Sequence, residues 1–318
     1  MLTRSRPMHV VVTGGAGFIG SHLCDALIAR GERVTCVDNL VGTGGSTRNV
    51  EHLLRHPRFE LVTEDVLEWT DRVRLGGVGC IFHLAASKNG VCMDDPERDL
   101  AVNALGTLKL VRAAARDGVR KLVHSSTGSV FGETDRRHTE DVPKLPVSYY
   151  GVSKLAGESY CRVIGDMTGL DYTILRYYHV IGPRQDGSPT GGVVPIFARR
   201  ALRGEPLTID GDGEQTRSFT SVHDAVRANL IASEHPEARG ATLTCASGIR
   251  VSIRELADYV IRQTSSRGGI RHAPARVGDI RHFDVDNSAL RRLGLDFTTD
   301  WQAMVRDVIA SLAEPRAA

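Results

Sequence analysis

Two residues of the stretch YYGVSK could carry out proton transfer. Tyr150 and Lys154 are four positions apart, so they share one face if the segment is helical. A tyrosine has an ordinary pKa of about 10, and it acts as a base near neutral pH only where cations stabilise its phenolate. Lys154 supplies such a cation, whereas Tyr149 has Ser153 in the corresponding place. The pair therefore indicates a catalytic base with its electrostatic partner.

A glycine-rich stretch near the N-terminus, TGGAGFIG, could hold a pyrophosphate. Gly14, Gly17 and Gly20 are spaced three apart, between an apolar run and a helical pattern. Glycines allow a tight turn and a close approach of the backbone to phosphates, which then face the helix N-terminus. Asp38 ends the next apolar run, and a carboxylate there accepts hydrogen bonds from a ribose 2′-hydroxyl and repels a 2′-phosphate. The pattern predicts NAD as the cofactor, with Asp65 as a further candidate near the adenine. The oxidised nicotinamide of NAD would be a second cation beside Tyr150.

The elements that must position these residues alternate along the first part of the chain. Strands are predicted at 9–13, 33–38, 59–65, 80–86, 120–126 and 171–178, and helices at 18–31, 97–117 and 148–165. Buried strands that alternate with helices are typical of βαβ units and of a parallel sheet covered on both faces. We therefore predict an α/β fold with a Rossmann-type doubly wound parallel sheet.

Beyond residue 178 the pattern becomes looser. Residues 182–192 indicate a loop, 211–219 a turn that leads into a strand, and 196–206, 222–233 and 253–263 indicate helices. We predict a Rossmann domain over 1–178, with 222–247 packing back on its sheet. Residues 179–221 and 248–318 would form a smaller α/β substrate-binding lobe, and 306–318 are expected to fray.

Composition and charge argue against several classes of protein. The 318 residues are 41% apolar and 25% charged, which is ordinary for a globular protein, and a net charge of +2 with scattered basic residues does not indicate a nucleic-acid partner. No apolar run is long enough for a membrane span, and the glycine-rich start does not fit a signal peptide. The six cysteines show no CxxC spacing and the histidines no ligand spacing, so we predict no metal site and a cytoplasmic location.

Motifs that run in order from residue 13 to residue 279 resemble those of one enzyme family. They are TGGAGFIGSHL, VDNL, FHLAA, NALGTLKLVRAA, SSTGSVFGE, YYGVSK, LRYYHVIGPRQ, GVVPIF, GDGEQTRSF and RVGD. Together they resemble an extended short-chain dehydrogenase/reductase of the nucleotide-sugar epimerase/dehydratase family. The pattern is most similar to that of UDP-glucose (UDP-galactose) 4-epimerases.

The resemblance assigns roles to individual residues. Tyr150 would be the catalytic base, Lys154 would hold the nicotinamide ribose and Thr127 would bond the sugar 4-hydroxyl. The residues assigned to NAD are Gly14, Gly17, Phe18, Ile19, Gly20, Asp38, Asn39, Asp65, Val66, Leu84, Ala85, Ala86, Lys88, Asn103, Ser125, Tyr150 and Lys154. Those assigned to the substrate are Lys88, Ser126, Thr127, Tyr150, His179, Val194, Arg217, Arg276, Asp279 and Phe283.

Two of these residues depart from the family pattern. His179 stands where family members often have asparagine, and Ser218 follows Arg217 where an aspartate is common. The usual role of position 179 is therefore open in this chain, and Arg217 lacks its usual local partner.

The two residues after Thr127 bear on the outcome of the reaction. By resemblance, every reaction of the family would begin with loss of the 4-hydroxyl proton to Tyr150 and of the C4 hydride to NAD. The resembling 4,6-dehydratases carry Asp and Glu directly after this threonine, and the resembling decarboxylases typically carry Glu two residues after it. Here Gly128 and Ser129 cannot transfer a proton near pH 7, which favours 4-epimerisation of a UDP-sugar.

Three alternatives stay open at this point. The chain could be a UDP-glucuronate epimerase or decarboxylase, a sugar dehydratase, or a non-catalytic NAD-binding regulator. Asp186 stands where glucuronate epimerases carry an arginine and would repel a C6 carboxylate, although Arg184 could offset this. Phe283 would crowd an N-acetyl group, which favours UDP-glucose and UDP-galactose. The resemblance also implies a homodimer built on the helices near 97–117 and 148–165.

Overall fold

The alternation of apolar residues in the first strand gives the central sheet two buried faces. In a computed structural model, which describes residues 7–41, 46–87, 92–188, 191–275, 281 and 283–313, Val10 and Val12 pack on one face and Val11 on the other. The seven strands of this sheet are β1 (His9–Thr13), β2 (Arg33–Val37), β3 (Phe59–Val62), β4 (Val78–His83), β5 (Lys121–Thr127), β6 (Asp171–Tyr177) and β11 (Thr242–Cys245).

Strand order follows the doubly wound pattern. The order is β11-β6-β5-β4-β1-β2-β3, and all pairings are parallel. The chain winds from β1 outwards to β3, then returns to β4 and winds the other way. Ligands of such sheets bind outside the carboxyl ends of the strands at this switch point. The predicted fold class is confirmed.

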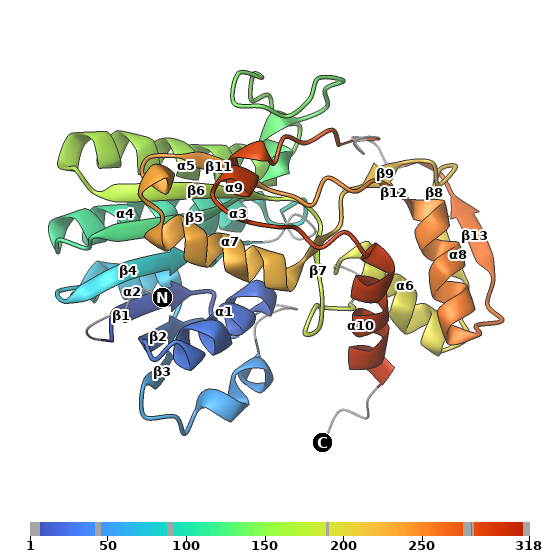
Figure 1. Cartoon of the computed structure of the whole chain (residues 1–318), viewed down its shortest axis with the longest axis horizontal. Coiled ribbons are helices and arrows are strands. Elements are labelled where there is room, and N and C mark those ends of the chain that lie inside the picture. The colour runs from blue at the N-terminus through green and yellow to red at the C-terminus, as the bar shows by residue number, and fades with distance from the viewer. Residues whose placement is uncertain are drawn as a thin grey trace.

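Helices cover both faces of the sheet (Figure 1). The helices α1 (Phe18–Ala29) and α7 (Val222–Glu234) share an apolar cluster with Val10 and Val12. On the opposite face, α2 (Val66–Arg72), α4 (Thr107–Arg116) and α5 (Tyr149–Thr168) pack around Val11. Short 3₁₀ helices are η1 (Thr47–Asn49), η2 (Glu51–Leu53), η4 (Gly128–Phe131) and η5 (Pro236–Ala238).

The single helix predicted at 97–117 is interrupted. It consists of α3 (Pro96–Leu100), a π-helical turn η3 (Ala101–Gly106) and α4. The hydroxyl of Thr107 donates to the carbonyl oxygen of Asn103 at 2.7 Å within this turn. Such π-helical turns occur frequently at functional sites.

A second apolar cluster lies beside the sheet, around residues such as Phe197, Leu207, Leu256 and Val305. Its helices are α6 (Val193–Leu202), α8 (Ile253–Thr264) and α10 (Trp301–Ala313), on the opposite side of Figure 1 from most of the sheet. Its strand pairs are β8 (Leu207–Asp210) with β13 (Ile270–Ala273), β9 (Thr216–Arg217) with β12 (Val251–Ser252), and β7 (Val180–Ile181) with β10 (Thr220–Ser221).

The C-terminal part of the chain differs from its prediction. Residues 306–313 are helical and do not fray, because α10 buries Val305 and Val308 in the second cluster, against α6, while 314–318 lie outside the described residues. The short helix α9 (Ser288–Arg292) precedes it, and Leu290 and Phe297 pack in the first cluster with α1 and α7. The predicted domain boundaries stay a prediction, with 288–297 packing on the sheet side of the molecule.

Candidate active site

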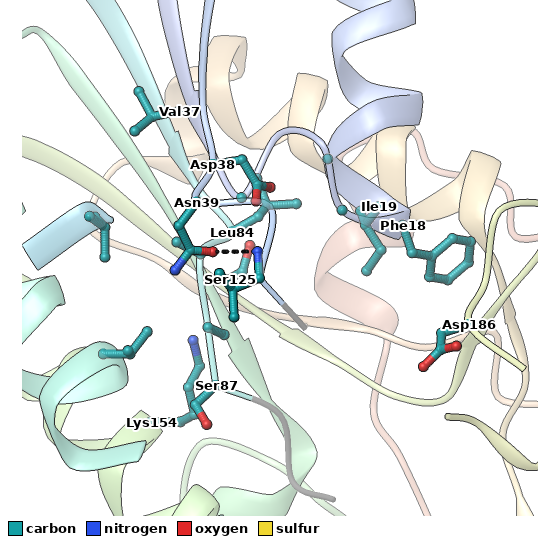
Figure 2. A pocket seen from close by; sticks show the side chains of 18 of the residues that line it. Phe18, Ile19, Val37, Asp38, Asn39, Leu84, Ser87, Ser125, Lys154 and Asp186 are labelled. Atoms are coloured by element: carbon teal, nitrogen blue, oxygen red, sulfur yellow. Dashed lines mark hydrogen bonds between the residues drawn. The ribbon is translucent and has the colours of Figure 1, made fainter. Parts of the chain in front are cut away.

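A cavity of about 520 Å³ opens at the carboxyl ends of the strands (Figure 2). Its walls contain every residue assigned to NAD within the described part of the chain, except Asn103. These residues are Gly14, Gly17, Phe18, Ile19, Gly20, Asp38, Asn39, Asp65, Val66, Leu84, Ala85, Ala86, Ser125, Tyr150 and Lys154. Lys88, Arg276 and Asp279 lie outside the described residues.

The glycine-rich loop leaves no room for side chains at two positions. Gly14 has φ +69°, and a Cβ there would lie 2.6 Å from the backbone nitrogen of Ala85. A Cβ at Gly20 would lie 2.8 Å from the Cα of Gly15 and closer still to the carbonyl oxygen of Gly14. The loop can therefore bring its backbone against a ligand at the N-terminus of α1, which fits a pyrophosphate.

The carboxylate of Asp38 is hydrogen-bonded within the protein. It accepts hydrogen bonds from the backbone nitrogens of Ala16 and Leu40, at 3.0 and 2.9 Å. Burial raises the pKa of Asp38, and these backbone hydrogen bonds oppose the rise. The carboxylate thus braces the glycine-rich loop while it lines the cavity, which fits recognition of a ribose hydroxyl.

Asp65 is also bonded within the protein. It caps α2 by accepting from the nitrogen of Leu67 at 2.9 Å, and it accepts from Asn39 Nδ2 at 2.9 Å. It also forms an ion pair with Arg98, a cavity residue that the sequence did not predict. No local pattern could identify this pair, because it joins the residue that begins α2 to α3.

The proposed catalytic residues come from β5 and α5. Ser148 caps α5 by accepting from the nitrogen of Gly151 at 3.1 Å, and this fixes where the helix begins. Tyr150 and Lys154 then face the cavity, as their four-residue spacing predicts. Thr127 at the end of β5 is buried and bonds the phenol of Tyr150, although it does not line the cavity.

The electrostatics of this pair explain why Tyr150 needs more than one cation nearby. Burial, and then the charge of Asp99, raise the pKa of Tyr150 to about 12, and the bond from Thr127 only partly offsets this. Burial lowers the pKa of Lys154 to about 8. In the chain alone Tyr150 therefore stays protonated near pH 7, because burial disfavours the phenolate. A further positive charge in the cavity is needed for Tyr150 to act as a base.

Position 128 is closed by an aromatic ring. The side chain of Tyr178, which follows β6, occupies the space in front of Gly128. The next residue, Ser129, accepts a hydrogen bond from the hydroxyl of Thr127 at 3.2 Å. The positions after Thr127 thus offer a glycine and a hydroxyl, and neither is an acid or a base near neutral pH.

The residues assigned to the sugar nucleotide are only partly brought together. Ser126 lines the cavity and donates to Glu158 at 2.6 Å. The rings of His179 and Phe283 lie 4.9 Å apart, and the guanidinium of Arg217 lies 5.6 Å from the Phe283 ring. This trio does not line the cavity. Val194 is packed inside the second apolar cluster.

The loop after β7 supplies cavity walls that were not assigned to the cofactor. Gln185, Asp186, Gly191 and Gly192 line the cavity, and Figure 2 shows Asp186 on the opposite side from Asn39. Arg184 adopts φ +65° and forms an ion pair with Asp25 of α1 at 2.8 Å. In the described part of the chain no cluster of three or more histidine, cysteine or acidic residues could hold a metal ion, and no helix there is long and apolar enough to cross a membrane.

Comparison with known proteins identifies the family. Residues 10–245, more than half of the chain, match the family described as "NAD dependent epimerase/dehydratase family". The chain belongs to this family. The predicted family, and with it the predicted cofactor NAD, are confirmed.

The similar proteins of this family carry names that describe different activities. A "UDP-glucose 4-epimerase" of Mycolicibacterium smegmatis is 36% identical over 305 residues, covering 94% of each chain. A "UDP-N-acetyl-alpha-D-glucosaminuronate decarboxylase" of Bacillus cytotoxicus is 35% identical over 274 residues, covering 83% of each. The crystal structure of a Thermotoga maritima UDP-glucose 4-epimerase with UDP-glucose has a TM-score of 0.88 and 34% identity, covering 96% of this chain and 98% of that one.

Proposed function

We propose that the protein catalyses NAD-dependent 4-epimerisation of a UDP-sugar through a transient 4-keto sugar, with UDP-glucose and UDP-galactose as the favoured pair. The observation that carries this proposal is the end of β5, where Thr127 is followed by Gly128 under the ring of Tyr178 and by Ser129. Elimination or decarboxylation needs an added acid or base, and these two positions hold none. Oxidation and reduction at one carbon need only Thr127, Tyr150 and the cofactor.

The residues present fit NAD. The glycine-rich loop admits a pyrophosphate, Asp38 would bond the ribose hydroxyls, and Lys154 would hold the nicotinamide ribose. When bound, NAD supplies a hydride acceptor for sugar C4 that can return the hydride to either face. Asp38 would repel the 2′-phosphate of NADP.

Proton transfer is assigned to the residues of this chain. Tyr150 would take the proton of the sugar 4-hydroxyl and later return it, and Thr127 would align that hydroxyl with the phenol. Lys154, as a buried cation, would stabilise the phenolate once another positive charge is present in the cavity. General-base catalysis of this kind needs the base within hydrogen-bond reach of the reacting hydroxyl.

Two structural observations weigh against the alternatives. Asp186 lines the cavity and places a carboxylate on its wall. This disfavours a substrate with a C6 carboxylate, as in glucuronate epimerases and decarboxylases. A non-catalytic NAD-binding role is disfavoured by the joint presence of Thr127, Tyr150 and Lys154 at one place.

The deciding experiment offers the purified protein a panel of UDP-, dTDP-, GDP- and CDP-sugars and identifies the products by NMR. Interconversion of UDP-glucose and UDP-galactose is expected. Loss of carbon dioxide from a UDP-uronate, or of water from any sugar nucleotide, would instead support the decarboxylase or dehydratase alternative. No turnover of any sugar in the NAD-loaded protein would support the regulator.

We also propose a homodimer that works in the cytoplasm. Tyr149, Val152, Tyr160, Val163 and Met167 form one exposed apolar face of α5, and exposed Leu100 and Leu105 lie on the adjoining α3–η3 segment. Such a face is best covered by a second copy, and light scattering should show a dimer that Val163→Glu dissociates. All six cysteines are buried and none forms a disulfide bond, which suits a reducing compartment.

A further inference from the structure

A buried carboxylate that the proposed mechanism does not use lies beside the catalytic pair. Asp99 on α3 is 1% exposed, and its Oδ2 has no hydrogen-bond partner of good geometry among the described residues. The hydroxyl of Ser153 lies close enough to oppose the rise that burial causes in the pKa of Asp99. Its Oδ1 accepts a hydrogen bond from Asn103 Nδ2 at 2.8 Å. A buried charge needs an opposite charge nearby to compensate for lost hydration. The structure therefore has to supply a cation close to Asp99.

Lys154 is that cation. It lies on α5 and is 1% exposed. The positive charge of Lys154 lowers the pKa of Asp99, and the negative charge of Asp99 raises the pKa of Lys154. The only other carboxylate that acts on Lys154 within the described chain is Glu158, which already binds Arg176 through two hydrogen bonds of 2.8 and 2.6 Å. Glu158 acts on Lys154 more strongly than Asp99 does, but its charge is shared with Arg176. Asp99 has no ion pair of its own within the described chain, so its charge is balanced by Lys154.

Within the described residues, a tyrosine, two cysteines and two histidines are the other titratable groups around Asp99 and Lys154. Tyr150 and Cys92 each affect the pKa of the other, and the negative charge of Asp99 raises the pKa of both. Cys161 on α5 acts on Lys154, and Lys154 acts on His83 and His124, whose tilted rings have centroids 5.4 Å apart. Burial lowers the pKa of His83 to about 3 and that of His124 well below its usual range, so neither ring is charged near pH 7.

Asn103 joins this charge pair to the cavity wall. Its Oδ1 accepts from the nitrogen of Ser87 at 2.9 Å, and its Nδ2 donates to the carbonyl oxygen of Ser87 at 3.2 Å. The same Nδ2 lies 3.2 Å from the hydroxyl of Ser153, the residue before Lys154. The π-helical turn η3 thus links Asp99 to the segment after β4 and to the catalytic helix.

We propose that Asp99 is a positioning residue of the active site: its carboxylate is the buried counter-charge of Lys154, and through Asn103 it holds the cavity wall at Ser87 against α5. The inference rests on the proposed function, in which Tyr150 is the base. A negative charge keeps an ammonium protonated and makes a phenol harder to ionise. Tyr150 would then release its proton readily only when a positive charge, such as that of the oxidised cofactor, is bound in the cavity.

The test uses the NAD-loaded protein with Asp99→Asn, which removes the charge and keeps the size of the side chain. Both limbs of the pH profile of turnover are expected to move to lower pH by about one unit, a tenfold change in ionised fraction at fixed pH. The two limbs move the same way, because removal of a neighbouring negative charge lowers the pKa of a phenol and of an ammonium alike. A merely structural role would lower the profile without moving it.

Asp224→Asn is the matched control. Asp224 is fully buried, does not line the cavity, and accepts hydrogen bonds from Arg227 and Thr298. Its replacement should reduce stability and leave both limbs in place.

A second measurement needs no sugar nucleotide. Near-ultraviolet absorbance follows phenolate formation in the NAD-loaded protein, and Tyr150→Phe serves as the blank for the Tyr150 step. Asp99→Asn should move this step to lower pH, whereas Asp99→Glu keeps the charge and should leave it near its wild-type position. The proposal is overturned if Asp99→Asn moves neither the step nor the limbs, or if Asp99→Glu moves them equally far. Because no sugar is present, this outcome is separate from an error in the proposed substrate.

Discussion

The ring of Tyr178 lies so close to Gly128 that no side chain fits at position 128. A Cβ there would lie 2.7 Å from Cδ1 of Tyr178, and nearer still to Cε1 and Cζ. The ring cannot easily retreat, because Tyr178 is 2% exposed and its hydroxyl is bonded to Nδ1 of His138 at 2.9 Å. A carboxylate at this position would therefore need more than one substitution.

Gly128→Ala should lower the free energy of unfolding by about 1–3 kcal/mol, the usual cost of overpacking a filled site. Urea denaturation measures the change. Gly76→Ala is the control, since no atom lies within 4 Å of the added Cβ, and it should be close to neutral. Equal stability of the two variants would show that Tyr178 moves aside without cost.

The purified protein should carry NAD, because epimerisation regenerates the cofactor in every cycle. Denaturation followed by assay of the released nucleotide identifies it. Asp38→Ala should retain less NAD, because it removes both a ribose acceptor and the brace to Ala16 and Leu40. Recovery of NADP from the wild-type protein would contradict the role given to Asp38.

Tyr150→Phe and Lys154→Ala should each reduce kcat by about 10²–10⁴-fold, with a much smaller effect on KM. Thr127→Val should be milder, since Thr127 only aligns the proton path. Steady-state kinetics with the sugar nucleotide found by NMR provide the measurement. Full activity of Tyr150→Phe would exclude the proposed base.

His124 should make the protein less stable in acid. Both ring nitrogens lack hydrogen-bond partners in the described part of the chain, and burial holds the pKa well below its usual value. Below about pH 6.5 the unfolded chain takes up a proton there that the folded chain does not, so stability falls by up to about 1.4 kcal/mol per pH unit. His124→Leu should flatten this decline between pH 6.5 and 5, as measured by urea denaturation at several pH values. The exposed His272→Leu should leave the slope unchanged, and an unchanged slope in His124→Leu would show that the ring is protonated in the folded state.

Phe283→Ser should raise turnover of UDP-GlcNAc relative to UDP-glucose, if Phe283 limits the space beside the sugar. The structure buries this ring against Tyr178 and His179, so a stability loss of about 3 kcal/mol is also expected. Phe297→Ser, in the first apolar cluster, controls for stability alone and should leave the substrate ratio unchanged. An unchanged ratio in Phe283→Ser would assign the ring to the core only.

The sequence predicted those parts of the site that depend on local spacing. Gly14, Asp38 and the pair Tyr150–Lys154 each lie at the end of a strand or on one helix face, so periodicity was enough to place them at one cavity. The ion pair of Arg98 with Asp65 and the closure of Gly128 by Tyr178 depend on segments that meet only in the folded chain. The raised pKa of Tyr150 was missed for the same reason, because it depends on burial rather than on neighbours in sequence.

The π-helical turn at Ala101–Gly106 also limits how this chain can change in length during evolution. Such a turn is equivalent to one additional residue in a continuous helix. Deleting that residue would let α3 and α4 join into one continuous helix, but α3 would rotate by about 100° about the helix axis. Asp99 would then lose its hydrogen bond to Asn103 and its position near Lys154. Surface loops elsewhere tolerate insertions and deletions. Between Asp95 and Thr107, in contrast, the number of residues should be as constrained as their identity.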